Sequence, residues 1–444
     1  MTYKEALQYL ESFINYEKLD GYNYKSSLKL DRMKRFSGLL GDPQKAVPSI
    51  HIAGTKGKGS TAVYIYSILK AAGFKTGLYT SPHLVDFRER IRINGELISE
   101  EDICSMLDKI KNVIERSMSE DRPTFFEVYT ALAYLYFKEK RADIAVYEVG
   151  LGGRLDATNV IEPLTCAITP LSYEHTDKLG KTLKEIATEK CGIIKNSAIC
   201  ISAPQETEAL EVIKDVCAEK NAKLIMVGKD IITEEVRCDE GGEVFNLWGP
   251  SGDYSLLTTS MIGAHQIINA AVAVGIAEAL RFRGVAITDG AIRTGIMDAS
   301  WEGRLEVIDR RPYIVLDGAQ NRASARALVS AIKKIFKYRK LFLIFGVSKD
   351  KDISGMLEEI LPVCGDVILT KSKILGRAME PDKIREFIDR INHAAIDIEL
   401  TLDVASALDK AISKAGHQDL ILVTGSLFIV GEARESFKKC LKTV

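Results

Sequence analysis

The stretch Gly54-Thr55-Lys56-Gly57-Lys58-Gly59-Ser60-Thr61 constrains the fold of this chain more than any other. An apolar run over residues 47–53 precedes it, and residues 60–72 carry apolar side chains at helical spacing until Gly73. The predicted order is therefore strand, glycine-rich loop, helix. Glycines let such a loop turn tightly with its N–H groups directed inward, and the helix N-terminus adds positive potential at the same place.

This loop has the composition of a phosphate-binding site. Lys58 supplies a mobile positive charge, while Gly57, Gly59 and Ser60 supply backbone N–H groups and a hydroxyl. Because Gly59 separates the lysine from Ser60, the spacing departs from the strict P-loop rule and the stretch is a variant of that motif. A surface turn rich in glycine and lysine is the alternative, and the strand-loop-helix context favours the nucleotide site.

Three polar residues stand at or just after the carboxyl ends of predicted strands: Ser81, Glu148 and His175. In open α/β sheets ligands gather outside those ends, so the three side chains could meet. A carboxylate in a buried parallel strand is unfavourable unless it is paired or metal-bound, which makes Glu148 a candidate magnesium ligand. A plain Ser-Pro turn and a structural histidine are the alternatives for Ser81 and His175.

Two further segments have the character of ligand-binding loops. A second glycine loop, residues 150–159, follows Glu148 directly and offers Asp156 and Asn159 as hydrogen-bonding groups. The polar turn over residues 263–269 opens an alanine-rich helix and could contact an adenine. A structural turn and a helix start capped by its own amides are the respective alternatives.

The length of 444 residues exceeds what one hydrophobic core usually supports, so two domains are expected. Helical periodicity lapses near residue 298, and a new series of strands and helices begins at Trp301. We therefore predict an α/β protein with a P-loop-type N-terminal ATP-binding domain, residues 1–297, around a central, mostly parallel sheet. A smaller, Rossmann-like C-terminal α/β domain would occupy residues 298–444.

The composition points to a protein that acts on small molecules. With 60 basic and 61 acidic residues the net charge is −1, so no overall field favours nucleic acid or a membrane surface. The most apolar run, residues 420–430, is too short to span a bilayer. The eight cysteines are scattered, which indicates reduced thiols in a cytoplasmic protein. We expect a monomer with neither nucleic-acid nor membrane partners.

Together these segments resemble the Mur ligase superfamily, and within it the folylpolyglutamate and dihydrofolate synthases. The similarity runs from the first predicted helix to Arg434. In chain order it is carried by Gly54 to Ser60, Thr80 to Leu84, Glu148 to Asn159, Gly263 to Gln266 with Asn269, and Gly303 to Glu306.

The resemblance implies an ATP-dependent acid–amino acid ligase. Such an enzyme would join the carboxylate of a pterin-bearing acid, folate or dihydropteroate, to the amine of L-glutamate. The carboxylate would first take the γ-phosphoryl group of ATP, and the amine would then attack the acyl phosphate. Two Mg²⁺ ions are implied as cofactors.

The resemblance also assigns roles to individual residues. The ATP site would comprise Gly57, Lys58, Gly59, Ser60, Asn269, Arg304 and Asp317. The pterin pocket would comprise Thr124, Phe126, Asp156 and Ala157. The metal ligands would be Ser81, Glu148, His175 and a carbamylated Lys190, and catalysis would depend on Lys58, His175 and Lys190. By position alone, Lys190 is a solvated lysine at a helix C-terminus.

Three residues depart from the family pattern. Gln320 and Arg322 stand where the family usually has histidine and proline, and Glu174 stands where it usually has aspartate. These departures concern the second-substrate side of the site. A related Mur-type ligase for another carboxylate is therefore an alternative, and an ATP-hydrolysing conformational switch is another.

Overall fold

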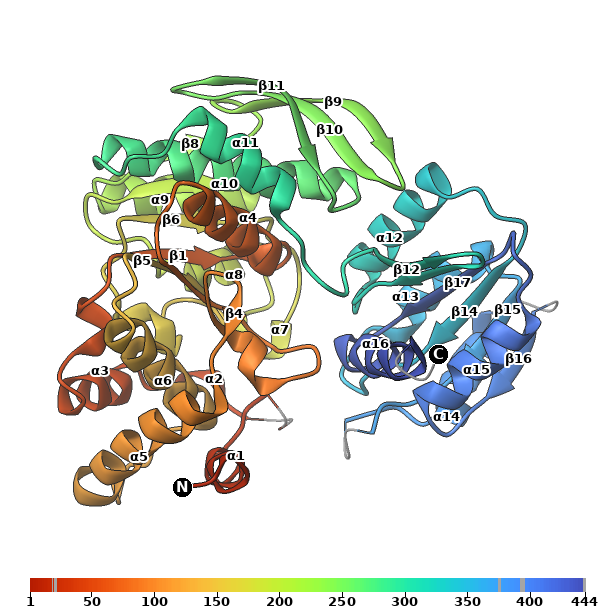
Figure 1. Ribbon diagram of the computed structural model, residues 1–444, viewed down its shortest axis with the longest axis horizontal. Helices are drawn as coiled ribbons and strands as arrows, with labels where there is room; N and C mark the ends of the chain where they lie inside the picture. Colours follow the sequence, from red (N-terminus) through yellow and green to blue (C-terminus); the bar gives the residue numbers. More distant parts are fainter. Residues whose placement is uncertain (18, 20–21, 374–376, 392–395, 442–444) are drawn as a thin grey trace.

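The computed structural model describes residues 1–444 except 18, 20–21, 374–376, 392–395 and 442–444, and except the side chains of 25 and 438–441. Figure 1 shows two α/β lobes side by side, each built around its own sheet. No helix in the described part is long and apolar enough to cross a membrane. The seven cysteines with described side chains are free thiols, and Cys440 lies outside this set.

The first lobe is organised by an eight-stranded sheet of order β4-β3-β2-β5-β1-β6-β7-β8. Its strands are β1 Ser49–Ala53, β2 Thr76–Tyr79, β3 Ile91–Ile93, β4 Glu96–Leu97, β5 Ile144–Glu148, β6 Thr165–Ile168, β7 Ile199–Ser202 and β8 Lys223–Met226. All neighbours run parallel except β2 with β3 and β3 with β4. The predicted, mostly parallel sheet is confirmed.

Helices cover both faces of this sheet because its buried strands are apolar on both sides. On β5, Val146 joins the core under α4 and α10, whereas Ala145 and Tyr147 join the core under α5 and α6. The helices of this lobe are α1 Tyr3–Glu11, α2 Tyr24–Ser27, α3 Leu30–Leu39, α4 Lys58–Ala71, α5 Glu100–Ser117, α6 Phe125–Glu139, α7 Thr176–Leu179, α8 Leu183–Cys191, α9 Thr207–Glu219, α10 Ala264–Phe282 and α11 Asp289–Asp298.

A three-stranded antiparallel sheet extends from the first lobe toward the second (Figure 1). It comprises β9 Ile232–Asp239, β10 Gly242–Trp248 and β11 Asp253–Thr259. At its tip Glu240 contacts Tyr313 and lies 3.1 Å from an Arg310 nitrogen, both in the second lobe. This small sheet therefore forms one of the contacts between the lobes.

The second lobe is built on a six-stranded sheet of order β12-β13-β17-β14-β15-β16, parallel except for β12 with β13. Its strands are β12 Glu306–Arg310, β13 Tyr313–Leu316, β14 Leu341–Phe345, β15 Asp366–Leu369, β16 Asp397–Leu400 and β17 Leu420–Thr424. Its helices are α12 Arg322–Ile335, α13 Ile353–Ile360, α14 Pro381–Ile391, α15 Val404–Lys414 and α16 Leu427–Leu441. Residues 299–305 connect the two lobes.

Candidate active site

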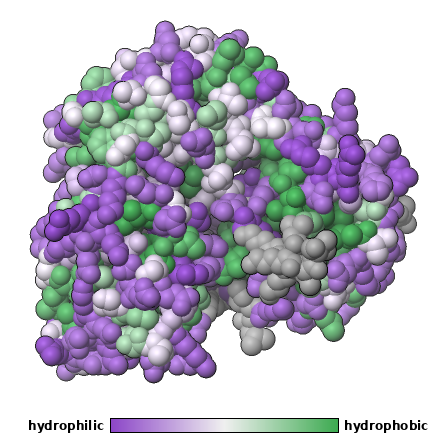
Figure 2. Space-filling view, in the orientation of Figure 1, coloured by the Kyte–Doolittle hydropathy of each residue, from purple (hydrophilic) through white to green (hydrophobic). Residues whose placement is uncertain are grey.

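A cavity of about 940 Å³ lies between the lobes, within the size range of small-molecule sites. In the space-filling view the two lobes meet along an indented boundary (Figure 2). The loops after β1, β2, β5 and β6 line the cavity from one side, and those after β13, β14 and β17 line it from the other. Every residue to which the family resemblance assigned a role lines this cavity, except Lys190. Asn159 does not line it, and its side-chain amide instead donates to the Arg154 and Gly192 carbonyls, both at 3.1 Å.

The glycine-rich loop bends directly into α4. Gly57 has a φ of 81°, which an L side chain rarely adopts, and Lys58 is the first residue of the helix. The helix thus begins two residues earlier than the sequence predicted. Its amino end and the half-buried Lys58 face the cavity, as a phosphate site requires.

Two residues from distant parts of the chain close against this loop. A Cβ on Gly57 would lie 2.2 Å from Oδ1 of Asn269, so glycine is required where the α10 turn meets the loop. A Cβ on Gly59 would lie 3.1 Å from Nε1 of Trp301, in the segment that joins the lobes. The structure thus brings Asn269 to the phosphate loop, and it adds Trp301, which the sequence did not indicate.

Ser81, Glu148 and His175 all line the cavity, and Ser81 and Glu148 are in direct contact. The Glu148 side chain is buried, and its Oε2 accepts a hydrogen bond from the Ser81 backbone N–H at 3.2 Å. Burial raises the pKa of Glu148 because it disfavours the charged carboxylate, and a bound cation would stabilise that charged form. Burial also lowers the pKa of His175 to about 4, so its imidazole is in the neutral, metal-ligating form. These donors fit a divalent cation.

Lys190 lies behind the phosphate loop, at the end of α8. Its buried Nζ donates to the Gly54 carbonyl at 2.7 Å. Burial lowers the pKa of Lys190 to about 7, so much of the amine is unprotonated near neutrality. The second glycine loop braces this helix, because the Arg154 backbone N–H donates to the Glu189 carbonyl at 2.7 Å. Lys190 is thus buried, and the solvated-lysine interpretation is wrong.

The predicted pterin residues also line the cavity. Phe126 packs against the second glycine loop so closely that a Cβ on Gly150 would lie 2.5 Å from its ring. Both oxygens of Asp156 already accept hydrogen bonds from its own loop, including the Gly150 backbone N–H at 3.1 Å. The Thr124 hydroxyl caps α6. Phe126 and Ala157 therefore offer apolar surface, while Asp156 and Thr124 organise the loop and the helix beside it.

The second lobe contributes Arg304 and Asp317. The Asp317 carboxylate accepts the backbone N–H groups of Leu305 at 3.0 Å and Ala319 at 2.9 Å. These bonds fix the loop after β13, on which Gln320 also faces the cavity. Both lobes therefore supply charged groups to the same space.

Sequence reasoning missed a network of charged side chains that lines the cavity. The buried Arg90 forms two hydrogen bonds with Glu17, at 2.8 and 2.7 Å, and its Nε lies 2.9 Å from Nδ1 of His83. Arg377 of the second lobe bonds the Glu17 carbonyl and, at 3.0 Å, Asp350. Glu17, Arg90 and Arg377 are far apart in the sequence, so no local pattern could have indicated the contacts among them.

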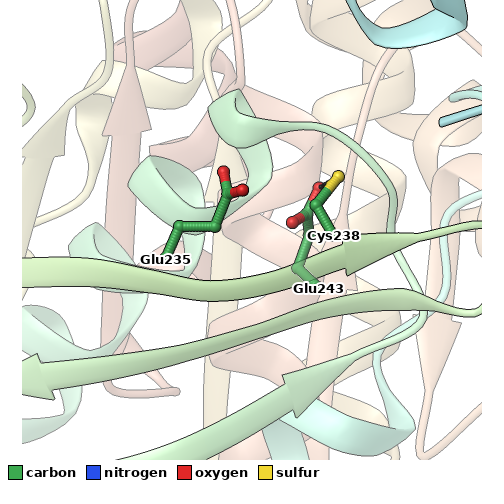
Figure 3. Close-up of side chains that lie close together, drawn as sticks. All are labelled: Glu235, Cys238 and Glu243. Carbon is green, nitrogen blue, oxygen red and sulfur yellow. Dashed lines mark hydrogen bonds between the residues drawn. The ribbon is translucent and has the colours of Figure 1, made fainter. Parts of the chain in front are cut away.

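Another cluster of possible metal ligands lies away from the cavity. It comprises Glu235, Cys238 and Glu243 on β9 and β10 (Figure 3). One ligand atom of each lies within 4.8 Å of the other two. Lys334 of α12 pairs with Glu235, and Glu243 accepts from Cys238 at 3.0 Å and from the Gly263 N–H at 2.7 Å. We interpret this cluster as part of the contact between the small sheet and the second lobe.

Known proteins match this chain along most of its length. Residues 52–277 match the Mur ligase middle domain, and residues 303–427 match the Mur ligase glutamate ligase domain. A dihydrofolate synthase/folylpolyglutamate synthase from Bacillus subtilis is 36% identical over 416 residues, covering 92% of this chain and 95% of that protein.

Solved structures agree with the sequence comparison. Folylpolyglutamate synthase from Mycobacterium tuberculosis, complexed with ADP, superposes with a TM-score of 0.89 at 31% identity and 98% coverage of both chains. Escherichia coli FolC, in complex with DHPP and ADP, superposes with a TM-score of 0.87 at 30% identity and 99% coverage of both. The predicted family resemblance is confirmed: the chain belongs to the Mur ligase family, on the branch of the folylpolyglutamate and dihydrofolate synthases, and is an ATP-dependent ligase.

Proposed function

We propose that this enzyme adds L-glutamate to the carboxylate of a pterin-bearing acid, folate or dihydropteroate, through an acyl phosphate. The observation that carries the proposal is the single cavity to which the phosphate loop, a buried strand-end carboxylate and charged groups of the second lobe all contribute. Relatives named dihydrofolate synthase/folylpolyglutamate synthase support the choice of substrates. We further propose that the enzyme works as a monomer in the cytoplasm.

In this proposal the two lobes bind different parts of the substrates. Residues 1–297 bind the phosphates of ATP through Gly57, Lys58, Gly59 and Ser60, and bind the pterin beside Phe126 and Ala157. Residues 298–444 complete the ATP site with Arg304 and Asp317 and bring in the amino acid. Asn269, in contact with Gly57, joins the adenine side to the phosphate side.

Ser81, Glu148 and His175 would hold Mg²⁺, and Lys190, once carbamylated, would offer oxygen ligands for a second ion. The neutral amine that burial favours at Lys190 is the form that reacts with CO₂. Bound Mg²⁺ would neutralise charge on the phosphoryl oxygens during transfer.

The first chemical step joins a carboxylate oxygen of the pterin acid to the γ-phosphorus and releases ADP. Lys58 and the N–H groups of the loop stabilise the charge on the transferring phosphoryl group. The cavity walls hold the carboxylate in line with that group, which converts a bimolecular encounter into an oriented reaction.

In the second step the amine nitrogen of glutamate attacks the acyl carbon. The bond between that carbon and the bridging oxygen breaks, and phosphate leaves with this oxygen and the electron pair of the bond. The ammonium group must lose its proton first. Glutamine is not a base, so Gln320 orients the amino acid or a phosphate oxygen, and water or another group takes the proton.

Phosphate release from ATP tests the proposal. The purified enzyme is given a panel of pterin acids and matched non-pterin carboxylates, each with and without L-glutamate. Release that requires both a pterin acid and glutamate is the expected result. Release without an amine would indicate the conformational switch, and a preference for another carboxylate would indicate a related Mur-type ligase.

A further inference from the structure

Two loops of the first lobe are joined along the cavity wall. The backbone N–H groups of Thr55 and Lys56 donate to the Pro170 carbonyl at 3.1 and 3.2 Å. The Thr55 hydroxyl donates to the Ser172 carbonyl, and the Ser172 N–H donates back to that hydroxyl, both at 3.2 Å. The phosphate loop is therefore fixed to the loop that carries His175.

A further contact between these loops is an ion pair. Nζ of Lys56 lies 3.1 Å from Oε1 of Glu174, and the two side chains are only 30% and 13% exposed. The same Oε1 lies 3.5 Å from Nδ2 of Asn321, whose Oδ1 caps α12 by accepting the Ser324 N–H at 2.9 Å. One carboxylate thus contacts both the phosphate loop and the second lobe.

Positive charge from both lobes surrounds this carboxylate. Besides Lys56, Lys351 on the loop after β14 in the second lobe lines the same cavity, and its charge acts on Glu174. Cations from both lobes therefore converge on a single anion.

We infer that Glu174 is a positioning residue that clamps the phosphate loop to the second lobe. The clamp holds Lys58, on one side of the cavity, and Asp317, on the other, around the same nucleotide, so the inference rests on the proposed function. It also gives the departure at position 174 a physical meaning. Glutamate is one methylene longer than the aspartate usual in the family, and that length lets it reach Lys56 and Asn321 together.

Loss of the clamp should affect turnover more than nucleotide binding. Without Glu174, the N–H groups of the phosphate loop and Lys58 remain and continue to attract the phosphates. The second lobe, however, loses a contact that fixes its position against the phosphate loop. Small misplacements of reacting groups lower the rate of the chemical step. The expected signature is a lower kcat with a nearly unchanged KM for ATP.

A double-mutant cycle tests this inference. The variants are Glu174→Gln, Glu174→Asp, Lys56→Met and Glu174→Gln with Lys56→Met. Glu174→Gln should lower kcat roughly ten- to hundredfold, and Glu174→Asp should lower it less, because the charge remains but the reach is shorter. The double variant should be no slower than Glu174→Gln, because the pair acts as a unit. Lys334→Met, which breaks an ion pair between the lobes outside the cavity, should leave kcat unchanged.

Wild-type kcat in Glu174→Gln or Glu174→Asp, a loss confined to KM, or independent effects of the two single changes would each overturn the inference. Small-angle scattering with a nonhydrolysable ATP analogue separates it from the proposed function. The nucleotide-bound wild type should be more compact than nucleotide-bound Glu174→Gln, whatever the substrates are. Equal radii of gyration would contradict the clamp, whereas wild-type enzyme without glutamate-dependent turnover would contradict only the proposed function.

Discussion

The amide oxygen of Asn269 lies where a side chain on Gly57 would have to go: a Cβ there would approach it to 2.2 Å. This contact joins the amino end of α10 to the phosphate loop, across more than two hundred residues of sequence. The two segments therefore hold each other in place where they line the cavity.

Gly57→Ala should therefore distort the phosphate loop for two reasons. The new Cβ would clash with Asn269, and the φ of 81° is unfavourable for alanine. We expect it to abolish ligation and to lower the free energy of unfolding by about 1–3 kcal/mol. Adding Asn269→Ala removes the clash, so urea unfolding should show partial recovery of stability without recovery of turnover. If the double variant were no more stable than Gly57→Ala, the contact would not be the cause.

Lys58→Ala should abolish ligation and leave the fold intact. Lys58 is half-buried at the cavity and provides charge instead of core packing. We expect kcat to fall by about 10²-fold or more, with the free energy of unfolding changed by less than about 0.5 kcal/mol. Lys70→Ala, at the exposed end of the same helix, is the matched control. Near-normal turnover in Lys58→Ala would show that the phosphates bind elsewhere.

Lys190 should be carbamylated in the active enzyme. Because burial brings its pKa to about 7, the reactive neutral amine becomes abundant as the pH rises through that value. Labelled bicarbonate should give a carbamate carbon signal in wild type that is absent in Lys190→Ala and retained in Lys184→Ala, an exposed lysine of the same helix. Full activity of Lys190→Ala, with or without bicarbonate, would rule out the modification as a catalytic requirement.

His51 should make the fold sensitive to acid. It is fully buried on β1, where burial lowers its pKa from 6.5 to about 3 and its Nε2 lies 2.8 Å from the Thr158 hydroxyl. The unfolded chain therefore binds a proton below about pH 6.5 that the folded chain does not. Stability should fall on acidification from that pH, by up to about 1.4 kcal/mol per pH unit for this group.

Urea unfolding at pH 7, 6 and 5 checks this slope. His51→Gln loses stability at pH 7 through packing, but it lacks the titrating group, so the gap between variant and wild type should narrow as the pH falls. A gap of constant size would mean that His51 does not contribute to the acid sensitivity.

The strand ends that hold Ser81, Glu148 and His175 could be predicted from the sequence because the strands before them are short, apolar and buried on both faces. Strand β9 could not, because most of its residues are exposed and carry no hydrophobic pattern. In the sequence, Lys56 is only one of two lysines in the glycine-rich loop. The fold shows that its carboxylate partner is Glu174, 118 residues away. Contacts of this kind depend on how two loops and two lobes meet, which local spacing does not encode.

Isotope transfer tests the central claim, that the pterin carboxylate is activated by phosphorylation, most directly. The enzyme is given ATP, glutamate and a pterin acid whose carboxylate carries ¹⁸O, and the released phosphate is analysed by mass spectrometry. Because the acyl carbon to oxygen bond breaks when the amine attacks, each phosphate should carry one oxygen from the carboxylate. Phosphate that contains no ¹⁸O, released in step with amide formation, would contradict the account.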